Sequence, residues 1–138
     1  HTPDAVEKAL ESLRPVAEAR GGKLWTLIGA GGNRDHGKRP IMGRIAAQLS
    51  DEIIVTSDNP RFEEPSEIAR MVAEGAGSPR IVLDRAEAIR EAVREAAPED
   101  VILVAGKGHE TYQEVRGVRH HFSDVEALRA AFEAKKKL

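Results

Sequence analysis

The sequence predicts an α/β domain with a mostly parallel sheet, and two patterns predict it. Four short aliphatic runs are typical of buried strands, at residues 23–29, 52–57, 80–84 and 100–106. Segments with helical spacing of apolar residues separate these runs, an alternation that places parallel strands in a sheet covered by helices on both faces. A predicted hairpin at residues 112–122 adds an antiparallel edge. The expected architecture is a Rossmann-like three-layer domain.

The chain begins with a predicted helix. Thr2 can cap this helix with Pro3 at its first position, and Gly21 can end it. Its apolar face comprises Val6, Leu10, Leu13 and Ala17. Pro15 lies within the pattern and predicts a kink or an early end, because proline lacks the N–H that the helix needs.

The later helices have recognisable starts. They are predicted over residues 40–49, 66–74, 85–97 and from 124 onwards. Asp84 with Glu87, and Ser123 with Glu126, have the spacing of capping boxes. Trp25, in the middle of the first strand with apolar neighbours, is predicted to lie in the core.

Composition excludes several classes of function. With 41% hydrophobic and 32% charged residues, the 138-residue chain is expected to fold as one globular domain. A formal net charge of −2 gives no reason to expect a nucleic-acid or membrane partner, and no apolar run approaches the ~20 residues of a membrane span. The absence of cysteine excludes disulfides, thiolate metal sites and a cysteine nucleophile.

The start of the chain carries two expectations. No signal peptide is visible, so a soluble, cytoplasmic domain is expected. The first residue is His1 rather than Met, and Thr2 begins the predicted helix at once. We therefore expect a domain that belongs to a longer protein.

Polar loops follow three of the four strands. These loops are GAGGNRDHGKRP at residues 29–40, SDNPRFEEP at 57–65 and AGKGHETYQ at 105–113, whereas the third strand passes directly into a capped helix. In open α/β sheets, ligands bind beyond the carboxyl ends of the strands. The three loops together therefore predict one binding edge.

The first of these loops is close to a P-loop in sequence. Its glycines and Lys38 have the right spacing, but Arg39 stands where a Ser or Thr hydroxyl would hold magnesium. Pro40 also removes an amide where an anion would bind, and Arg34 stands where a dinucleotide fingerprint needs its third glycine. A degenerate nucleotide site is disfavoured, and a glycine-rich turn with solvated charges is the simpler alternative.

The three loops carry side chains of both charges. The cations are Arg34, Lys38, Arg39, Arg61 and Lys107, and the anions are Asp35, Asp58, Glu63, Glu64 and Glu110. A ligand with both carboxylate and ammonium groups would require both signs, and an arginine can bind the carboxylate with two N–H groups. Pro60 would fix the backbone beside Arg61. The alternative is mutual neutralisation by surface ion pairs.

The sequence shows no reaction centre of its own. His36 and His109 lie in the polar loops without an evident nucleophile to serve. Alternation along the hairpin sends His120 and His121 to opposite faces, which disfavours a shared metal ion, and Ser57 lacks the context of a nucleophile elbow. A binding edge without catalytic residues or a metal site is therefore predicted.

Four segments, in this order, resemble a known family. HTPDAVEKAL, GAGGNRDHGKRPIMG, TSDNPRFEEP and AGKGHETYQ are similar to the C-terminal domain of MurE-type Mur ligases, and the likeness covers nearly all of residues 1–138. The resemblance implies a three-domain enzyme of peptidoglycan synthesis. Its UDP-binding and central ATPase domains would lie outside this chain, which would hold the incoming amino acid.

The resemblance also implies a reaction. ATP would phosphorylate the D-glutamyl carboxylate of UDP-MurNAc-L-Ala-D-Glu, and the amine of a diamino acid would attack the acyl phosphate. ATP and Mg²⁺ would be bound mainly by the central domain, so the isolated domain would be inactive. The motif favours meso-diaminopimelate, with lysine and ornithine left open.

Individual residues take roles from this resemblance. The implied diamino-acid site comprises Arg34, Asp58, Asn59, Pro60, Arg61, Gly106 and Glu110. Arg61 would bind the far carboxylate, and Glu110 with backbone groups would receive the ammonium end. His1, Lys38 and Arg39 would lie near the nucleotide.

Two alternatives to this function stay open at this point. One is a stand-alone nucleotide- or anion-binding module, which would bind ATP or phosphate independently of diamino acids. The other is the C-terminal domain of a folylpolyglutamate-synthetase-like ligase, which shares the architecture.

Overall fold

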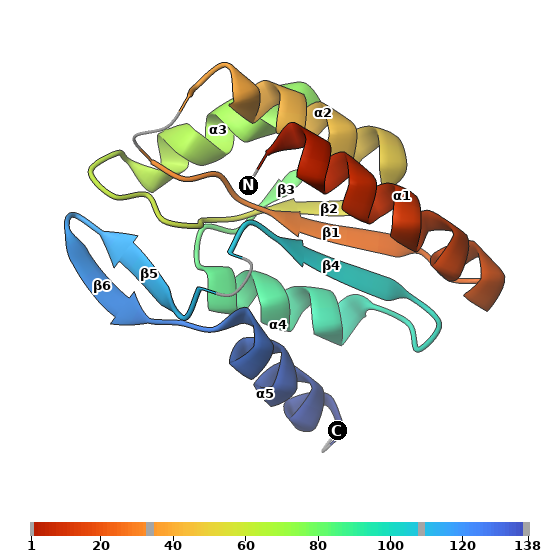
Figure 1. The fold of residues 1–138 in the computed structure, drawn as a ribbon. Helices are drawn as coiled ribbons and strands as arrows, with labels where there is room; N and C mark the ends of the chain where they lie inside the picture. The colour runs from red at the N-terminus through yellow and green to blue at the C-terminus, as the bar shows by residue number, and fades with distance from the viewer. Residues whose placement is uncertain (1, 33–34, 108–109, 137–138) are drawn as a thin grey trace.

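The computed structural model describes residues 2–32, 35–107 and 110–136. Helices and strands alternate along most of this length (Figure 1). In chain order, the elements are α1 (Pro3–Arg20), β1 (Leu24–Ile28), α2 (Lys38–Leu49), β2 (Glu52–Val55), α3 (Pro65–Ala76), β3 (Arg80–Ile81), α4 (Arg85–Glu95), β4 (Val101–Ala105), β5 (Tyr112–Val115), β6 (Val118–His121) and α5 (Asp124–Lys136). Within the described residues, no helix is both long enough and apolar enough to cross a membrane.

The first four strands form one parallel sheet in the order β3-β2-β1-β4. Helices α1, α2 and α3 cover one face of the sheet, and α4 and α5 lie on the other (Figure 1). The predicted three-layer α/β architecture is confirmed. Because β1 lies between β2 and β4, the loops that follow these three strands are neighbours at one edge.

Strand β1 is the centre of the core. Leu24 and Ile28 belong to the hydrophobic cluster under α1–α3, whereas Trp25 and Leu27 belong to the cluster under α4 and α5. All five residues of the strand are buried, as a continuous apolar run predicts for a parallel strand covered on both faces. The core position predicted for Trp25 is confirmed.

The predicted hairpin is confirmed, but it does not extend the parallel sheet. Strands β5 and β6 pair antiparallel in a two-stranded sheet of their own. The hairpin attaches instead to the loop after β2: the Arg61 N–H donates to Glu114 O at 3.0 Å, and the Arg116 N–H donates to Arg61 O at 2.6 Å. Backbone pairing thus joins the hairpin to a site loop.

Several element boundaries differ from the sequence prediction. Helix α1 continues through Pro15, because this residue lies on the exposed side, where water can satisfy the carbonyl that loses its N–H partner. The helix ends at Gly21, with φ of 72°. Strand β3 comprises only Arg80–Ile81, shorter than the predicted run over 80–84. The caps are confirmed: side chains of Asp84 and Ser123 accept backbone N–H groups at the starts of α4 and α5.

Two carboxylates hold the start of β1, at the opposite edge from the polar loops. The first is Asp51, whose Oδ2 accepts the Leu24 N–H at 2.8 Å and Arg14 Nη1 at 2.9 Å. The hydrogen bond from Leu24, together with Arg14, lowers the pKa of the Asp51 carboxyl. The charged form is therefore the one that fixes this end of the strand.

The second carboxylate is Asp100, just before β4. Its Oδ1 accepts the Lys23 N–H, and its Oδ2 accepts Trp25 Nε1 and the Ala97 N–H, each at 2.9 Å. Burial acts to raise the pKa of Asp100, but these donors outweigh it and lower the pKa overall. A single side chain thus joins the starts of β1 and β4.

We predict that Asp100→Asn lowers the free energy of unfolding at pH 7 by about 1 kcal/mol, because the amide nitrogen cannot accept the donors that one carboxylate oxygen accepts. Since the folded-state pKa is lowered, the stabilisation is present above about pH 4 and is lost as the pH falls through the folded pKa. Urea unfolding from pH 7 to pH 2 measures the difference between the wild-type chain and the variant, which should shrink on acidification.

Glu11→Gln is the control for this experiment. Glu11 is exposed on α1, and no hydrogen bond or ion pair of its side chain occurs among the described residues. Its unfolding free energy should match that of the wild-type chain at every pH. A difference for Asp100→Asn that stays constant down to pH 2 would contradict the assigned role.

Candidate binding cleft at the strand ends

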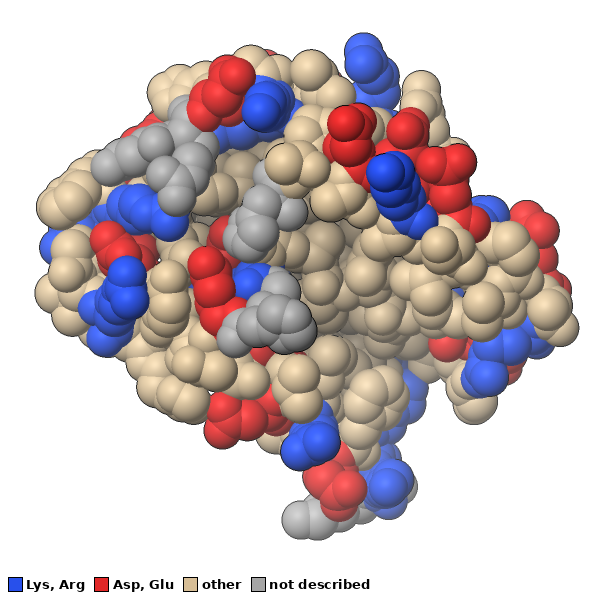
Figure 2. Space-filling view, in the orientation of Figure 1, with Lys and Arg blue, Asp and Glu red and all other residues tan. Residues whose placement is uncertain are grey.

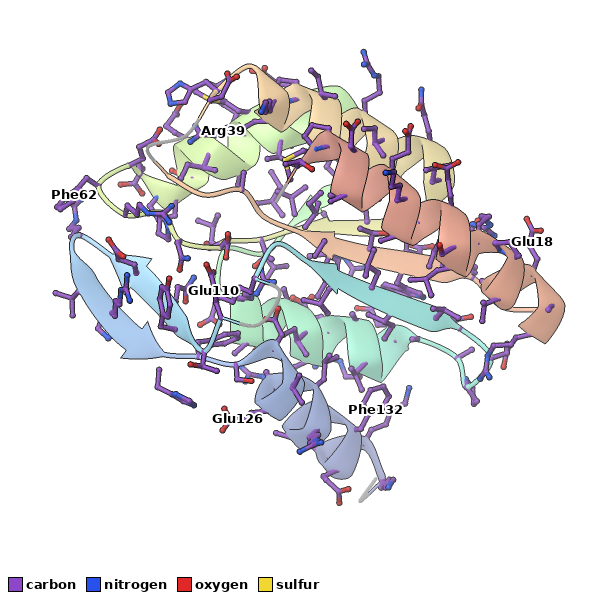
Figure 3. The ribbon with its side chains drawn as sticks, viewed as in Figure 1. Glu18, Arg39, Phe62, Glu110, Glu126 and Phe132 are labelled. Carbon is purple, nitrogen blue, oxygen red and sulfur yellow. The ribbon has the colours of Figure 1, made fainter. Side chains whose placement is uncertain are left out.

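The three polar loops meet beyond the carboxyl ends of β1, β2 and β4. A cavity of about 460 Å³ opens there, on the side that carries the labelled Arg39 and Glu110 (Figure 3). Its lining residues are Thr2, Gly29, Ala30, Gly31, Asp35, Lys38, Arg39, Met42, Asp58, Asn59, Arg61 and Glu110. Basic and acidic side chains both surround this end of the molecule (Figure 2). The three loops that were predicted to share one edge therefore line one cleft, and binding there stays a prediction.

The loops after β1 and β2 touch through their backbones. The Gly32 N–H donates to Asn59 O at 2.7 Å. A Cβ atom at Gly32 would lie 1.9 Å from Pro60 O, so only glycine permits this approach. Gly32 of the P-loop-like segment thus permits close contact between two loops.

A buried lysine joins the loops after β4 and β2. Lys107 is 1% exposed, and its Nζ donates to Asn59 Oδ1 at 3.1 Å and to Tyr112 O at 2.6 Å. The same Nζ lies 3.2 Å from Asp58 Oδ1, within ion-pair distance although the two atoms are not aligned for a hydrogen bond. One ammonium group therefore contacts the second loop, the third loop and the start of the hairpin.

The side chain of Asn59 connects Lys107 with the cleft residue Glu110. Its Oδ1 also accepts the Glu114 N–H at 2.9 Å. Its Nδ2 donates to Glu110 Oε1 at 3.1 Å. The side chain of Glu110 is thereby held against the wall that the second loop provides.

Arg61 lies in the cleft with a fixed backbone. Its φ of 54° is in the left-handed region, and its backbone pairs with the hairpin. Its Nη1 donates to Gly32 O at 3.0 Å and to Asn59 O at 3.4 Å, which are both carbonyl oxygens. These carbonyl oxygens orient the guanidinium, and no carboxylate of the described residues lies within 4.0 Å of it.

Arg39 is buried and bound on several sides. It is 1% exposed, and its two terminal nitrogens donate to the two Glu63 carboxylate oxygens at 3.2 and 2.8 Å. Gly31 O and Met71 Sδ accept from it as well, and His36 Nε2 lies 3.0 Å from Glu63. This side chain connects α2 with the first and second loops. A role for Arg39 near the nucleotide stays a prediction.

The geometry divides the loop charges into two groups. In the part of the chain that the structure describes, Arg61, Lys38 and Glu110 have no oppositely charged group within 4.0 Å, and all three line the cavity. Asp35 also lines the cavity, and no cation of the described residues lies within 4.0 Å of it. Two ion pairs neutralise other charges of the loops, so the neutralisation alternative holds only for these pairs. The neutralised pairs are Arg39–Glu63 and Lys107–Asp58.

Most of the predicted site residues come together. Those that line the cavity are Lys38, Arg39, Asp58, Asn59, Arg61 and Glu110. Pro60 lies between the lining residues Asn59 and Arg61 in the chain. Gly106, whose φ of 123° favours glycine, lies beside the lining residues Gly29 and Asp58 in space. Arg34 and His1 lie outside the described residues. Within the described ranges, no three His, Asp or Glu side chains gather as metal ligands.

The sequence analysis did not identify Arg85, which binds the backbone at the bases of two site loops. This side chain is 1% exposed and donates from two nitrogens to the Asp124 carboxylate, at 2.7 and 2.8 Å. It also donates to Ser57 O at 2.9 Å and to Ala105 O at 3.2 Å, where β2 and β4 lead into their loops. At the start of a charged helix its sequence pattern is that of a solvated residue, so no local signal marks it.

Fold and site together define the class of protein: an α/β domain with a cleft of mixed charge beyond the ends of its parallel strands. The family model described as "Mur ligase, glutamate ligase domain" matches residues 1–108. The chain therefore belongs to the Mur ligase family.

Curated relatives resemble nearly the whole chain. A UDP-N-acetylmuramoyl-L-alanyl-D-glutamate--2,6-diaminopimelate ligase of Chlorobaculum tepidum is 59% identical over 134 residues, which cover 96% of this chain and 26% of that protein. The enzyme of the same name from Acidovorax sp. is 57% identical, over 95% of this chain and 27% of its own length. The chain thus spans about a quarter of the length of these relatives.

Two solved structures are also similar to this chain. A structure of a UDP-N-acetylmuramoyl-L-alanyl-D-glutamate--2,6-diaminopimelate ligase matches 99% of this chain and 28% of its own, with a TM-score of 0.89 and 42% identity. Folylpolyglutamate synthase from Thermotoga maritima matches 74% of this chain and 22% of its own, with a TM-score of 0.56 and 23% identity. The second likeness shows a shared fold.

We predict that Arg39→Met lowers the free energy of unfolding by about 2 kcal/mol, because it leaves the largely buried Glu63 without the cation that binds both of its oxygens. Arg70→Met is the matched control: Arg70 pairs with Glu67 and Glu74 on the exposed surface of α3, where solvent screens ion pairs, so its loss should lower the free energy of unfolding much less. Urea unfolding followed by circular dichroism measures both. Equal losses would contradict the structural role of Arg39.

Proposed function

We propose that this chain is the amino-acid-binding domain of an ATP-dependent ligase that adds meso-diaminopimelate to UDP-MurNAc-L-Ala-D-Glu. The observation that carries the proposal is the 59% and 57% identity, over nearly the whole chain, to two ligases named for this substrate pair. The activity belongs to a longer protein. The proposal therefore places the UDP-binding and ATPase domains outside these 138 residues and expects the isolated domain to be inactive.

The charges of the cleft suit such a ligand. Diaminopimelate carries a carboxylate and an ammonium group at each end. Arg61 would bind the far carboxylate with the guanidinium N–H groups that the carbonyls leave over, and Glu110 would accept from the ammonium beside it. Lysine and ornithine lack this second carboxylate and would leave the arginine unpaired. Arg34 completes the proposed site from outside the described residues.

In the proposed reaction, ATP phosphorylates the D-glutamyl carboxylate, and the near amine of the diamino acid attacks the acyl carbon, so that an amide forms and phosphate leaves. This domain contributes positioning: when the far end is held by Arg61 and Glu110, the near amine is directed out of the cleft toward the acyl phosphate. Lys38, exposed at the start of α2, and His1 would approach the phosphates of the nucleotide.

ATP and Mg²⁺ are assigned to the other domains in this proposal. Mg²⁺ prefers oxygen ligands, and the described residues provide no cluster of three candidate side chains. When bound, Mg²⁺ would neutralise the phosphate charge during transfer. Because its substrates are ATP and a UDP-linked precursor, the ligase would act in the cytoplasm, with neither nucleic acid nor membrane as partner.

We predict that Arg61→Ala in the full-length ligase raises the KM for diaminopimelate about a hundredfold, because a charge-assisted double hydrogen bond is lost. The KM for ATP should change less than about twofold, since the arginine contacts only the amino-acid side of the reaction. Steady-state phosphate release, with diaminopimelate, lysine and ornithine offered in turn, measures both constants and the specificity.

Two controls accompany this measurement. Arg61→Lys keeps the charge but not the planar fork and should give an intermediate KM. Arg90→Ala removes an exposed arginine of α4 that pairs with Glu87, and should leave the kinetics unchanged. A wild-type ligase that prefers lysine or ornithine, or an unchanged KM for Arg61→Ala, would overturn the assignment.

A further inference from the structure

We propose that Lys107 is a positioning residue: it orients the amide of Asn59, and this amide holds the Glu110 carboxylate at the ammonium end of the ligand. The inference rests on the proposed function and deepens it. It concerns which of the two carboxylates, Asp58 or Glu110, binds the cation of the ligand.

The ammonium of Lys107 cannot take part in binding directly. Its side chain is fully buried, and its Nζ is surrounded by Asp58 Oδ1 at 3.2 Å, Asn59 Oδ1 at 3.1 Å and Tyr112 O at 2.6 Å. Two of its N–H groups donate to the oxygens of Asn59 and Tyr112, and the ion pair with Asp58 compensates its charge inside the protein. Lys107 also does not line the cavity. Its effect on a ligand must pass through the residues that it holds.

The contacts of Asn59 leave its amide one orientation. Oδ1 faces two donors, Lys107 Nζ at 3.1 Å and the Glu114 N–H at 2.9 Å. Rotation of the amide by 180° would direct its NH₂ group at both donors and would leave them buried without an acceptor. The NH₂ group must therefore point the other way, where it donates to Glu110 Oε1 at 3.1 Å.

The two cleft carboxylates, Asp58 and Glu110, differ in whether the Lys107 ammonium compensates their charge. Asp58 is 2% exposed and lies beside Lys107, so its charge is compensated inside the protein. Glu110 receives a hydrogen bond from a neutral amide and has no cation within 4.0 Å among the described residues. Of these two, Glu110 is the carboxylate that lines the cavity without a cation of the described residues beside it. The ligand class that it selects is a primary ammonium group.

The test is a double-mutant cycle in the full-length ligase, with Lys107→Met and Glu110→Gln alone and combined. We expect each single variant to raise the KM for diaminopimelate about tenfold or more, with the KM for ATP within about twofold. In the Lys107→Met background, Glu110→Gln should add less than about threefold, because the carboxylate has already lost its orientation. Multiplicative effects of the two substitutions would overturn the proposal.

Lys135→Met is the matched control. The ammonium of Lys135 is also held by backbone carbonyls, Val93 O and Ala96 O at 2.6 Å each, but beside α4 and away from the cleft. This variant should lower the melting temperature, leave the KM for diaminopimelate unchanged and preserve the full effect of Glu110→Gln. A merely structural Lys107 would behave in the same way, so equal behaviour of the two lysines would refute its positioning role.

A second variant keeps the test valid if Lys107→Met does not fold. Asp58→Asn combined with Lys107→Met removes both members of the buried pair and leaves no uncompensated charge. Asn59 still lacks its ammonium donor, so the raised KM and the lost coupling to Glu110→Gln should both persist. Different results would refute the proposed function and the positioning role of Lys107. A wild-type ligase that does not use diaminopimelate refutes the proposed function, whereas full use with multiplicative effects refutes only the positioning role.

Discussion

Lys107 places an ammonium group where solvent does not reach it, and a buried charge is tolerated only when polar partners surround it. Those partners come from separate segments: Asp58 and Asn59 follow β2, and Tyr112 begins the hairpin. The lysine itself follows β4. Because all of these contacts must form together, the second loop, the third loop and the hairpin have one mutual arrangement. The shape of the cleft depends on that arrangement.

Two further buried cations, Arg85 and Arg39, also hold the loops around the cleft in place. Arg85 joins the ends of β2 and β4 to Asp124 at the start of α5, and Arg39 joins α2 to Glu63 and to the carbonyl of Gly31. The terminal nitrogens of Arg39 and all three guanidinium nitrogens of Arg85 donate to protein acceptors. The charges that remain toward the cavity are therefore few and of both signs, which is what recognition of a ligand with carboxylate and ammonium groups requires.

The fold gathers the polar loops at one end of the domain. A parallel sheet brings three loop-bearing strand ends to one edge, and the opposite edge is closed by Asp51 and Asp100. The loops are rich in charge, yet the described part contains no cluster of metal ligands. In the proposed ligase, such a domain would hold and orient one substrate, and the other substrate would be activated elsewhere in the longer protein.

The sequence by itself determined the local features. The apolar run of β1, the caps Asp84 and Ser123, the three polar loops and their mixed charge are all properties of neighbouring residues, and all are found in the structure. The tertiary structure alone decided which charges are neutralised and where the hairpin attaches. Arg39 lies 24 positions before Glu63, and Lys107 lies 48 positions after Asn59. Ion pairing and burial depend on distances in space between such residues, and no local pattern encodes those distances.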